Sequence, residues 1–159
     1  EQIGSNNDAF ILQQGRSNLV VSSYQKGANN EVSLTLAGDF NGTDGTSPNN
    51  PGSFSGPAAG VGLAASTLFQ DGVGNSLTAL LTGNENQYAS RQDGNSNMAT
   101  ATVGGNENQF ALLQEGDGNN SNITQSGDLN NAGVSQMSDG NISNVMQMGD
   151  GNSATVNQM

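Results

Sequence analysis

The chain has 159 residues, of which 32% are hydrophobic, 4% aromatic and 11% charged, and it contains 23 glycines but no Trp, His or Cys. This composition is typical of disordered or repetitive chains rather than of an ordinary globular core, and it excludes disulfides and thiolate metal sites. The net charge of -11 argues against nucleic acid or anionic membranes as partners, and no apolar run approaches the roughly 20 residues that span a bilayer.

The first segment, residues 1–41, carries the pattern Gln-x-Gly-x-x-Asn. It is already in phase at Gln2-Ile-Gly4, so we expect sequence before Glu1. The pattern returns in 13–18 and, after one extra residue, in 25–30. In 36–41 a Leu takes the Gln place. No basic-then-apolar signal segment precedes the pattern, and we expect a soluble or already processed chain.

The second segment, residues 42–63, interrupts the repeat. It holds all three prolines, Pro48, Pro51 and Pro57, and lacks alternation, so it predicts an insertion loop rich in Gly, Pro and Ser. A flexible excursion is the favoured interpretation. The alternative is a full irregular rung, and both preserve the order of the strands.

The third segment, residues 64–159, resumes the pattern with a step of eleven residues. The step is clearest from Gln114 to Gln158, while Leu81 and Val103 replace Gln, and Ser138 replaces Gly. A repeat held in phase over this length is unlike a disordered Asn/Gln-rich chain. We therefore expect residues 1–41 and 64–159 to form one continuous repeat structure.

Five residues separate each Asn from the next Gln, and the second and fourth of them are apolar, aromatic or Ser in every unit. Alternation with period two predicts strands with one buried face. The expected strands are 7–13, 18–25, 30–36, 64–70, 75–81, 86–92, 97–103, 108–114, 119–125, 130–136, 141–147 and 152–158.

Paired strands joined by short arcs predict an all-β fold, a β-solenoid of about six stacked strand-arc-strand rungs with two parallel sheets. The departures from the pattern support stacking. Leu36, Leu81 and Val103 all fall on alternate strands, as expected if like residues stack within one sheet. A meander of hairpins gives no reason for that distribution.

Asn and Gln share the inward face with the apolar residues, where each amide can donate to the identical amide one rung away. The predicted ladder glutamines are Gln13, Gln25, Gln70, Gln92, Gln114, Gln125, Gln136, Gln147 and Gln158. The predicted ladder asparagines are Asn7, Asn18, Asn30, Asn75, Asn86, Asn97, Asn108, Asn119, Asn130, Asn141 and Asn152.

The Gly places between strands supply the tight arcs, where positive φ is needed. The predicted turn glycines are Gly15, Gly27, Gly38, Gly72, Gly83, Gly94, Gly105, Gly116, Gly127 and Gly149. Nearby carboxylates are expected to act as gatekeepers against premature aggregation. They are Asp71, Asp93, Asp117, Asp139 and Asp150.

The acidic turns do not predict a calcium site, because β-rolls that bind calcium have a nine-residue Gly-Gly-x-Gly-x-Asp period. The chain has no His or Cys, and its Ser and Thr residues have no activating base nearby in the pattern. We therefore expect no enzyme, no metal and no cofactor.

The motif Gln147-Met-Gly149-Asp-Gly-Asn152-Ser-Ala154, ending at Gln158, resembles the curlin repeat of curli subunits, and the resemblance covers nearly the whole chain outside the insertion. It implies a functional amyloid: a secreted subunit of an extracellular cross-β fibre, or pilus, at the bacterial cell surface. It also implies biofilm and adhesion roles, an outer-membrane secretion pore and a nucleator subunit as partners. The long insertion leaves open whether the chain is a major subunit or a nucleator-like paralogue.

Polymerisation would place the last rung of one copy, 141–147 and 152–158, against the first rung of the next, 7–13 and 18–25. The expected contacts are Gln147 with Gln13, Gln158 with Gln25, Asn141 with Asn7 and Asn152 with Asn18. We also consider that Phe10, Phe69 and Leu113 are exposed and bundle fibres, although chance placement of apolar residues on the surface is the favoured interpretation. The alternative function is a monomeric β-solenoid that binds ice or carbohydrate, although Thr100 and Thr102 form a single outward Thr pair that neighbouring rungs do not repeat.

Overall fold

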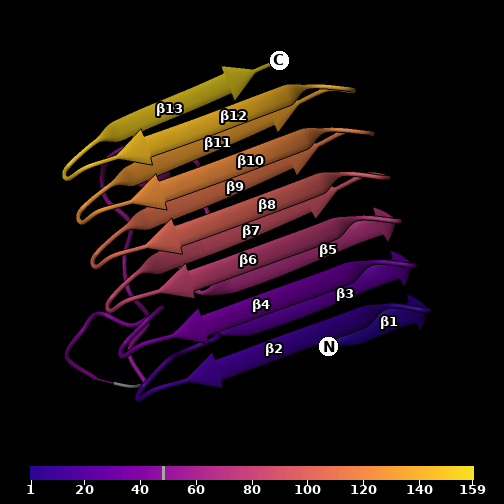
Figure 1. Ribbon diagram of the computed structural model, residues 1–159. Helices are drawn as coiled ribbons and strands as arrows, with labels where there is room; N and C mark the ends of the chain where they lie inside the picture. The colour runs from indigo at the N-terminus through magenta and orange to yellow at the C-terminus, as the bar shows by residue number, and fades with distance from the viewer. Residues whose placement is uncertain (48) are drawn as a thin grey trace.

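The computed structural model describes residues 1–47 and 49–159, so Pro48 of the expected insertion lies outside the described residues. The described part contains thirteen strands and one short helix, α1 (Gly56–Gly60). The strands are β1 (Gln2–Ser5), β2 (Asp8–Gln14), β3 (Ser22–Ala28), β4 (Glu31–Ala37), β5 (Thr67–Val73), β6 (Ser76–Thr82), β7 (Gln87–Asp93), β8 (Met98–Gly104), β9 (Gln109–Glu115), β10 (Asn120–Ser126), β11 (Asn131–Met137), β12 (Ile142–Met148) and β13 (Ser153–Gln158). Odd and even strands alternate between two stacked layers (Figure 1).

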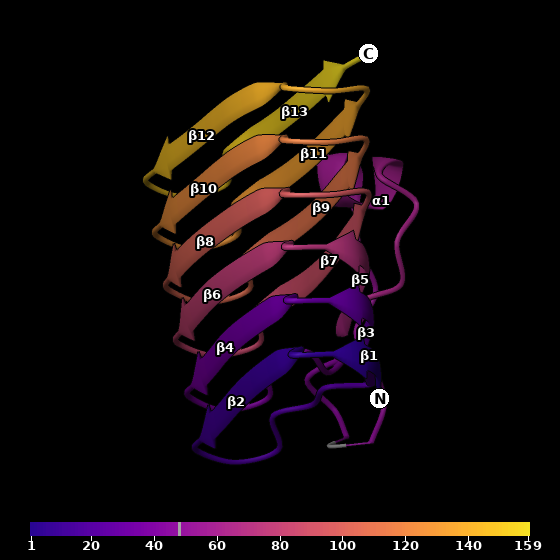
Figure 2. The same cartoon turned by 90° about the vertical axis from the view of Figure 1, so that its right-hand side faces the viewer.

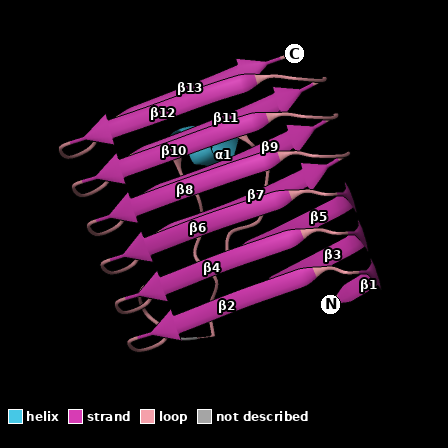
Figure 3. Cartoon of the chain, turned by 45° about the vertical axis from the view of Figure 1, so that its right-hand side comes forward, coloured by secondary structure: helices cyan, strands magenta, loops and turns pink. Residues whose placement is uncertain are grey.

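The two layers are parallel sheets that face each other (Figure 2). One sheet has seven strands in the order β1-β3-β5-β7-β9-β11-β13, and the other has six in the order β12-β10-β8-β6-β4-β2. The turns gather along the two edges of the stack (Figure 3). The predicted β-solenoid is confirmed, with one strand more than expected because the half-repeat at Gln2–Ser5 also pairs with β3.

The prediction that similar residues of alternate strands stack on one another is confirmed in the six-stranded sheet. Leu36 pairs in register with Leu81, and Leu81 pairs with Val103. These three side chains are buried and belong to the apolar core between the sheets. The alternation of the sequence therefore builds the core directly, because every second residue of each strand points inward.

Strand β3 begins at Ser22, later than the expected start at residue 18. The backbone of 18–21 instead follows the turn, where the Leu19 N–H donates to the Asn41 carbonyl at 2.9 Å. The extra residue in this repeat explains the difference, because a parallel ladder in register has no place for it.

The insertion adds no rung to the sheets, so the irregular-rung alternative is wrong. Strand β3 pairs directly with β5, and β4 pairs directly with β6, across the insertion. The described part of the insertion leaves the solenoid and runs along the outer face of the seven-stranded sheet, where α1 lies beside β9 and β11 (Figure 2).

Polar side chains on the outer face hold the insertion in place. The Ala58 N–H donates to Asn131 Oδ1 at 2.7 Å, and the Ser55 N–H donates to Gln109 Oε1 at 2.8 Å. Within the insertion, the hydroxyl and backbone N–H of Thr46 donate to Asp44 and hold the pKa of that carboxyl at about 2. The insertion is thus a packed cover of the described solenoid rather than a free loop.

The expected exposure of Leu113 is wrong, because the side chain is only 8% exposed; its strand, β9, is one of those that α1 contacts. Phe69 is half-buried and stacks on Tyr24, with 5.1 Å between the ring centroids. Phe10 is 57% exposed. Among the described residues, no helix has the length and apolar character needed to cross a membrane.

Candidate functional site: the amide ladders and the two ends of the solenoid

A continuous column of glutamines runs through the seven-stranded sheet. In each step, Nε2 of one glutamine donates to Oε1 of the next at 2.7–2.9 Å. Every donor lies on the side nearer the N-terminus, so the column has a direction. Its members are Gln2, Gln25, Gln70, Gln92, Gln114, Gln136 and Gln158.

The second N–H of these amides links the two sheets. Gln92 Nε2 also donates to the Ser76 carbonyl at 3.0 Å, and Gln114 Nε2 donates to the Met98 carbonyl at 3.0 Å, both in the facing sheet. A buried amide is costly without partners and stabilising with them. The column therefore satisfies its buried donors while it fixes the register of both sheets.

The six-stranded sheet has only fragments of such a ladder. Gln125 donates to Gln147 at 2.8 Å, but apolar residues occupy the places between Gln13 and Gln125. Gln13 Nε2 donates to the Asn18 carbonyl at 3.0 Å rather than to another glutamine. The predicted ladder residues of this sheet thus lie in one column but are not bonded along its whole length.

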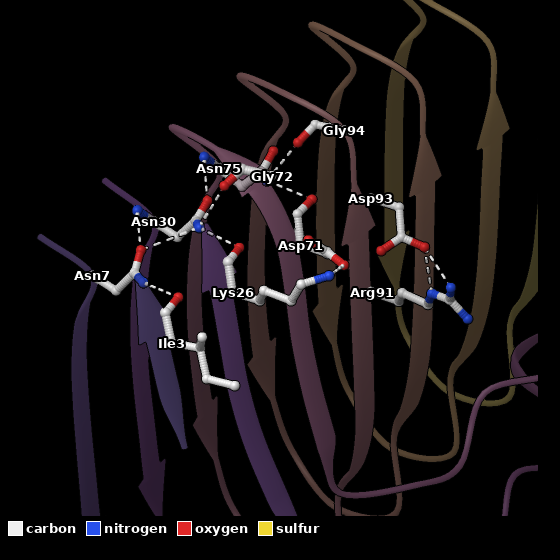
Figure 4. A network of polar contacts seen from close by, with 10 residues as sticks. All are labelled: Ile3, Asn7, Lys26, Asn30, Asp71, Gly72, Asn75, Arg91, Asp93 and Gly94. Carbon is white, nitrogen blue, oxygen red and sulfur yellow. Dashed lines mark hydrogen bonds and ion pairs between the residues drawn. The ribbon is translucent and has the colours of Figure 1, made fainter. Parts of the chain in front are cut away.

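The asparagines form two columns at the turns, and their most regular partners are backbone groups rather than the identical amides that the pattern suggested. The Asn75 N–H donates to Asn30 Oδ1 at 3.0 Å, and Asn30 Nδ2 donates to the Gly72 carbonyl at 2.9 Å (Figure 4). Amide-to-amide bonds occur at some steps, as between Asn86 and Asn41 at 3.0 Å. The columns are Asn7, Asn30, Asn75, Asn97, Asn119, Asn141 and Asn18, Asn41, Asn86, Asn108, Asn130, Asn152.

In eight of these residues the amide ties one turn to the next rung by two bonds. Its oxygen accepts from the Asn N–H of that rung, and its nitrogen donates to the Gly carbonyl of the same rung. A Gln at this place would be one methylene too long for both bonds, which explains why the two amides keep separate places in the repeat. Asn41, which is absent from the predicted ladder residues, belongs to the second column.

The turn glycines stack directly on one another. Gly72 has φ 127°, and a Cβ added there would lie 1.9 Å from the Gly94 carbonyl oxygen of the next rung. The other predicted turn glycines also have positive φ. Ser138, at the one place without Gly, has φ 99°, a conformation that side chains rarely adopt. The glycines thus allow both the arc and the close approach of successive rungs.

The five predicted gatekeeper aspartates occupy two different kinds of place. Asp71 and Asp93 stand next to the ladder glutamines and pair with cations, Asp71 with Lys26 at 2.9 Å and Asp93 with Arg91 at 2.8 Å (Figure 4). The hydrogen bond to Asp71 raises the pKa of Lys26. These pairs are exposed and so stabilise the fold only slightly.

The remaining three, Asp117, Asp139 and Asp150, lie in the turns directly after the Gly place. The Asn95 N–H donates to Asp117 Oδ1 at 2.7 Å, and the Asp117 N–H donates to Asp139 Oδ1 at 2.8 Å. Asp150 belongs to a second column of the same kind at the other edge, with Asp39, Asn84, Asn106 and Asp128. Sequence reasoning missed both outer columns. The available signal was the recurrence of Asp or Asn after the repeat glycine.

The two ends of the solenoid expose the same repeat pattern with opposite hydrogen-bonding character. At one end the column finishes with Gln2, whose Oε1 has no partner among the described residues, and at the other with Gln158, whose Nε2 donates only to the Ile142 carbonyl at 3.0 Å. The inward Ile11 of β2 is 37% exposed because no rung covers it. Both ends are thus open edges that another strand can extend.

Gln25 is not at the open end, in contrast to the expected contact with Gln158. Gln2 of β1 already occupies the place beside it and donates to Gln25 Oε1 at 2.7 Å. The residues expected to meet Gln147, Asn141 and Asn152 are at the end of the solenoid, since Gln13, Asn7 and Asn18 lie in its first rung.

The described residues contain no group of three or more Asp, Glu, His or Cys side chains arranged to hold a metal ion.

A family model, the curlin associated repeat, matches residues 4–38, which span β2, β3 and β4. Neither the curated proteins nor the solved structures contain a match to the chain.

Proposed function

We propose that this chain, a protein of curlin-associated repeats, is a structural subunit that polymerises end to end into an extracellular curli-like fibre. The observation that carries the proposal is the match between the two ends. Strands β2 and β12 are both open edges of one sheet and carry the same repeat, with Gln13 and Gln147 at the same place. A second copy can therefore continue the sheet with no change of register.

Such a contact joins two different surfaces of the same molecule. A heterologous contact of this kind does not close, so it generates a filament rather than a dimer. Gln147 Nε2 would donate to Gln13 Oε1 of the next copy, in the same direction as the bond from Gln125 to Gln147. The fibre would have strands perpendicular to its axis, which is the cross-β arrangement.

The monomeric binding module is the less supported alternative. Thr100 is flanked in register by Thr78 and Asn122, and Thr102 by Leu80 and Thr124. Ice and carbohydrate recognition by a solenoid would need a flat, regular array, and this outer face alternates between Thr, Asn and Leu. The structural character of the repeat also favours a fibre subunit over an enzyme.

The same proposal includes an extracellular location and roles in biofilm and adhesion. It also includes two partners, an outer-membrane secretion pore and a nucleator subunit. They follow from the resemblance to curli subunits and from the chemistry of the ends. The acidic surface is compatible with an exported chain that must stay soluble until it reaches a fibre end.

Dilution of the purified chain from denaturant tests the proposal. We expect thioflavin T fluorescence to rise after a lag that preformed fibres abolish, with unbranched filaments in electron micrographs. A stable soluble monomer with β-type circular dichroism and no filaments would instead support the solitary binding module.

A further inference from the structure

The outer face of the six-stranded sheet is open to solvent. In β6 the outward side chains Thr78, Leu80 and Thr82 are exposed, and the outward places of β8 and β10 are exposed or half-exposed. Figure 2 places the insertion and α1 on the opposite side of the solenoid, beside the seven-stranded sheet. Within the described residues no other element lies over this face, so it is available to a partner.

This face is nearly free of charge, although the chain as a whole carries -11. Only two of the 14 carboxylates, Asp8 and Glu31, occupy its outward places, and they are register partners at one corner. The outward places of β6, β8, β10 and β12 hold only uncharged side chains. Two acidic molecules of this kind therefore meet with the least repulsion through this face.

Short polar side chains make the middle of the face flat. Thr78 is the register partner of Thr100, and Thr102 is the register partner of Thr124. Flat sheets pack face to face at a spacing of about 10 Å. The hydroxyl and amide groups of this face can donate to and accept from the same groups of a second copy, which offsets the cost of their burial.

The seven-stranded sheet does not offer a second face of this kind. The insertion fits closely against small residues there, since Ala111 is fully buried and a Cβ added to Gly133 would lie 2.1 Å from the Pro57 carbonyl oxygen. Another part of the same face carries the exposed ion pairs of Asp71 and Asp93. The solenoid therefore has one free neutral face and one covered, charged face.

We propose that two copies pair through the outer faces of their six-stranded sheets, and that the insertion limits this lateral association to pairs. The pairing joins two fibres side by side, so it rests on end-to-end polymerisation. Each fibre has one free neutral face, and once that face is occupied the outer surfaces of the pair are the covered ones.

The size of the face fits a contact that becomes strong only in a fibre. Six strands at a spacing of about 4.8 Å, each of seven residues at about 3.3 Å per residue, give about 670 Å² per copy and about 1,300 Å² for two copies. This area is at the lower end of the range for specific protein interfaces. In a fibre the same contact recurs at every copy, so the pairing strengthens with fibre length.

A single charge near the middle of the face tests the pairing. Thr102→Glu places a carboxylate at an exposed position of β8, and each pair of fibres would have to bury it at every copy. We expect paired filaments in electron micrographs to become at least about tenfold rarer, while seeded elongation stays within about twofold of the wild type. Thr78→Glu repeats the test at an exposed position of β6.

The matched control is Met137→Glu, which adds the same charge at an exposed outward position of the seven-stranded sheet. We expect this variant to pair as the wild type does. Wild-type levels of pairing in both Thr102→Glu and Thr78→Glu would overturn the proposal. Equal loss of pairing in Met137→Glu would also overturn it, because the effect would then come from net charge and not from this face.

The mass per unit length of wild-type filaments tests the limit to pairs. We expect single filaments and filaments of twice their mass per unit length. Bundles of three or more would overturn the limit, and a population of single filaments alone would overturn the pairing but leave end-to-end growth standing. Complete absence of filaments would contradict end-to-end polymerisation itself, and the pairing with it.

Discussion

Gln125 of β10 and Val103 of β8 are register partners, and the side-chain carbonyl oxygen of Gln125 has no hydrogen-bond partner among the described residues. The equivalent oxygen of Gln92, in the other sheet, accepts from Gln70 at 2.7 Å. The two buried glutamines therefore differ in whether a neighbour completes the ladder.

This difference predicts unequal costs for the same substitution. Gln92→Leu leaves both Gln70 Nε2 and Gln114 Oε1 short of a partner and should lower the free energy of unfolding by about 2–4 kcal/mol. Gln125→Leu removes one unpaired oxygen and creates another at Gln147, so it should cost about 1–3 kcal/mol less. Denaturant unfolding of the soluble monomer measures both, and equal losses would contradict the ladder account.

The close stacking of the turns predicts that two Gly→Ala substitutions lower the free energy of unfolding by unequal amounts. Gly72→Ala places a Cβ 1.9 Å from the Gly94 carbonyl oxygen, and the backbone on both rungs must move. Gly118→Ala has open space around the added Cβ and only the strain of φ 69°, which costs roughly 1–2 kcal/mol. We expect the first variant to lose at least about 3 kcal/mol more than the second in the same unfolding assay.

The sequence predicted correctly which side chains stack where residues of the same type recur at equivalent places of alternate strands. The apolar column Leu36, Leu81 and Val103 could be foreseen, because parallel stacking places equivalent residues of alternate strands together. The backbone partners of the asparagines could not, since periodicity gives the place of a side chain but not the atom it bonds. The burial of Leu113 on β9, a strand that α1 contacts, could not be foreseen either, because the insertion has no periodicity from which its path could be inferred.

Charge at the ladder ends should block growth. In the double variant Gln147→Lys/Gln158→Lys, an ammonium replaces the amide that continues each column, and its burial at a joint is costly. We expect seeded elongation, followed by thioflavin T, to slow at least tenfold. Met146→Lys on the same strand points outward, is 65% exposed in the wild type and should elongate nearly normally. Unchanged growth of the double variant would rule out the proposed ends.

Removal of the turn charges tests the gatekeeper role. Asp117→Asn/Asp139→Asn/Asp150→Asn keeps the three Oδ1 acceptors in the two outer columns while it reduces the net charge from -11 to about -8. We expect a shorter lag at low salt, because less repulsion opposes the meeting of two chains. Added salt should shorten the lag of the wild type and narrow the difference, whereas an unchanged lag at low salt would contradict the role.

The mass per unit length of single filaments tests end-to-end stacking most directly. Six rungs of about 4.8 Å give a rise of about 29 Å per copy of 16.1 kDa, or about 0.56 kDa per Å. Scanning transmission electron microscopy of unstained filaments should return this value, or whole multiples of it where filaments bundle. A flat stack with one chain per strand spacing would give about 3.4 kDa per Å, and that result would contradict a fibre of joined solenoids.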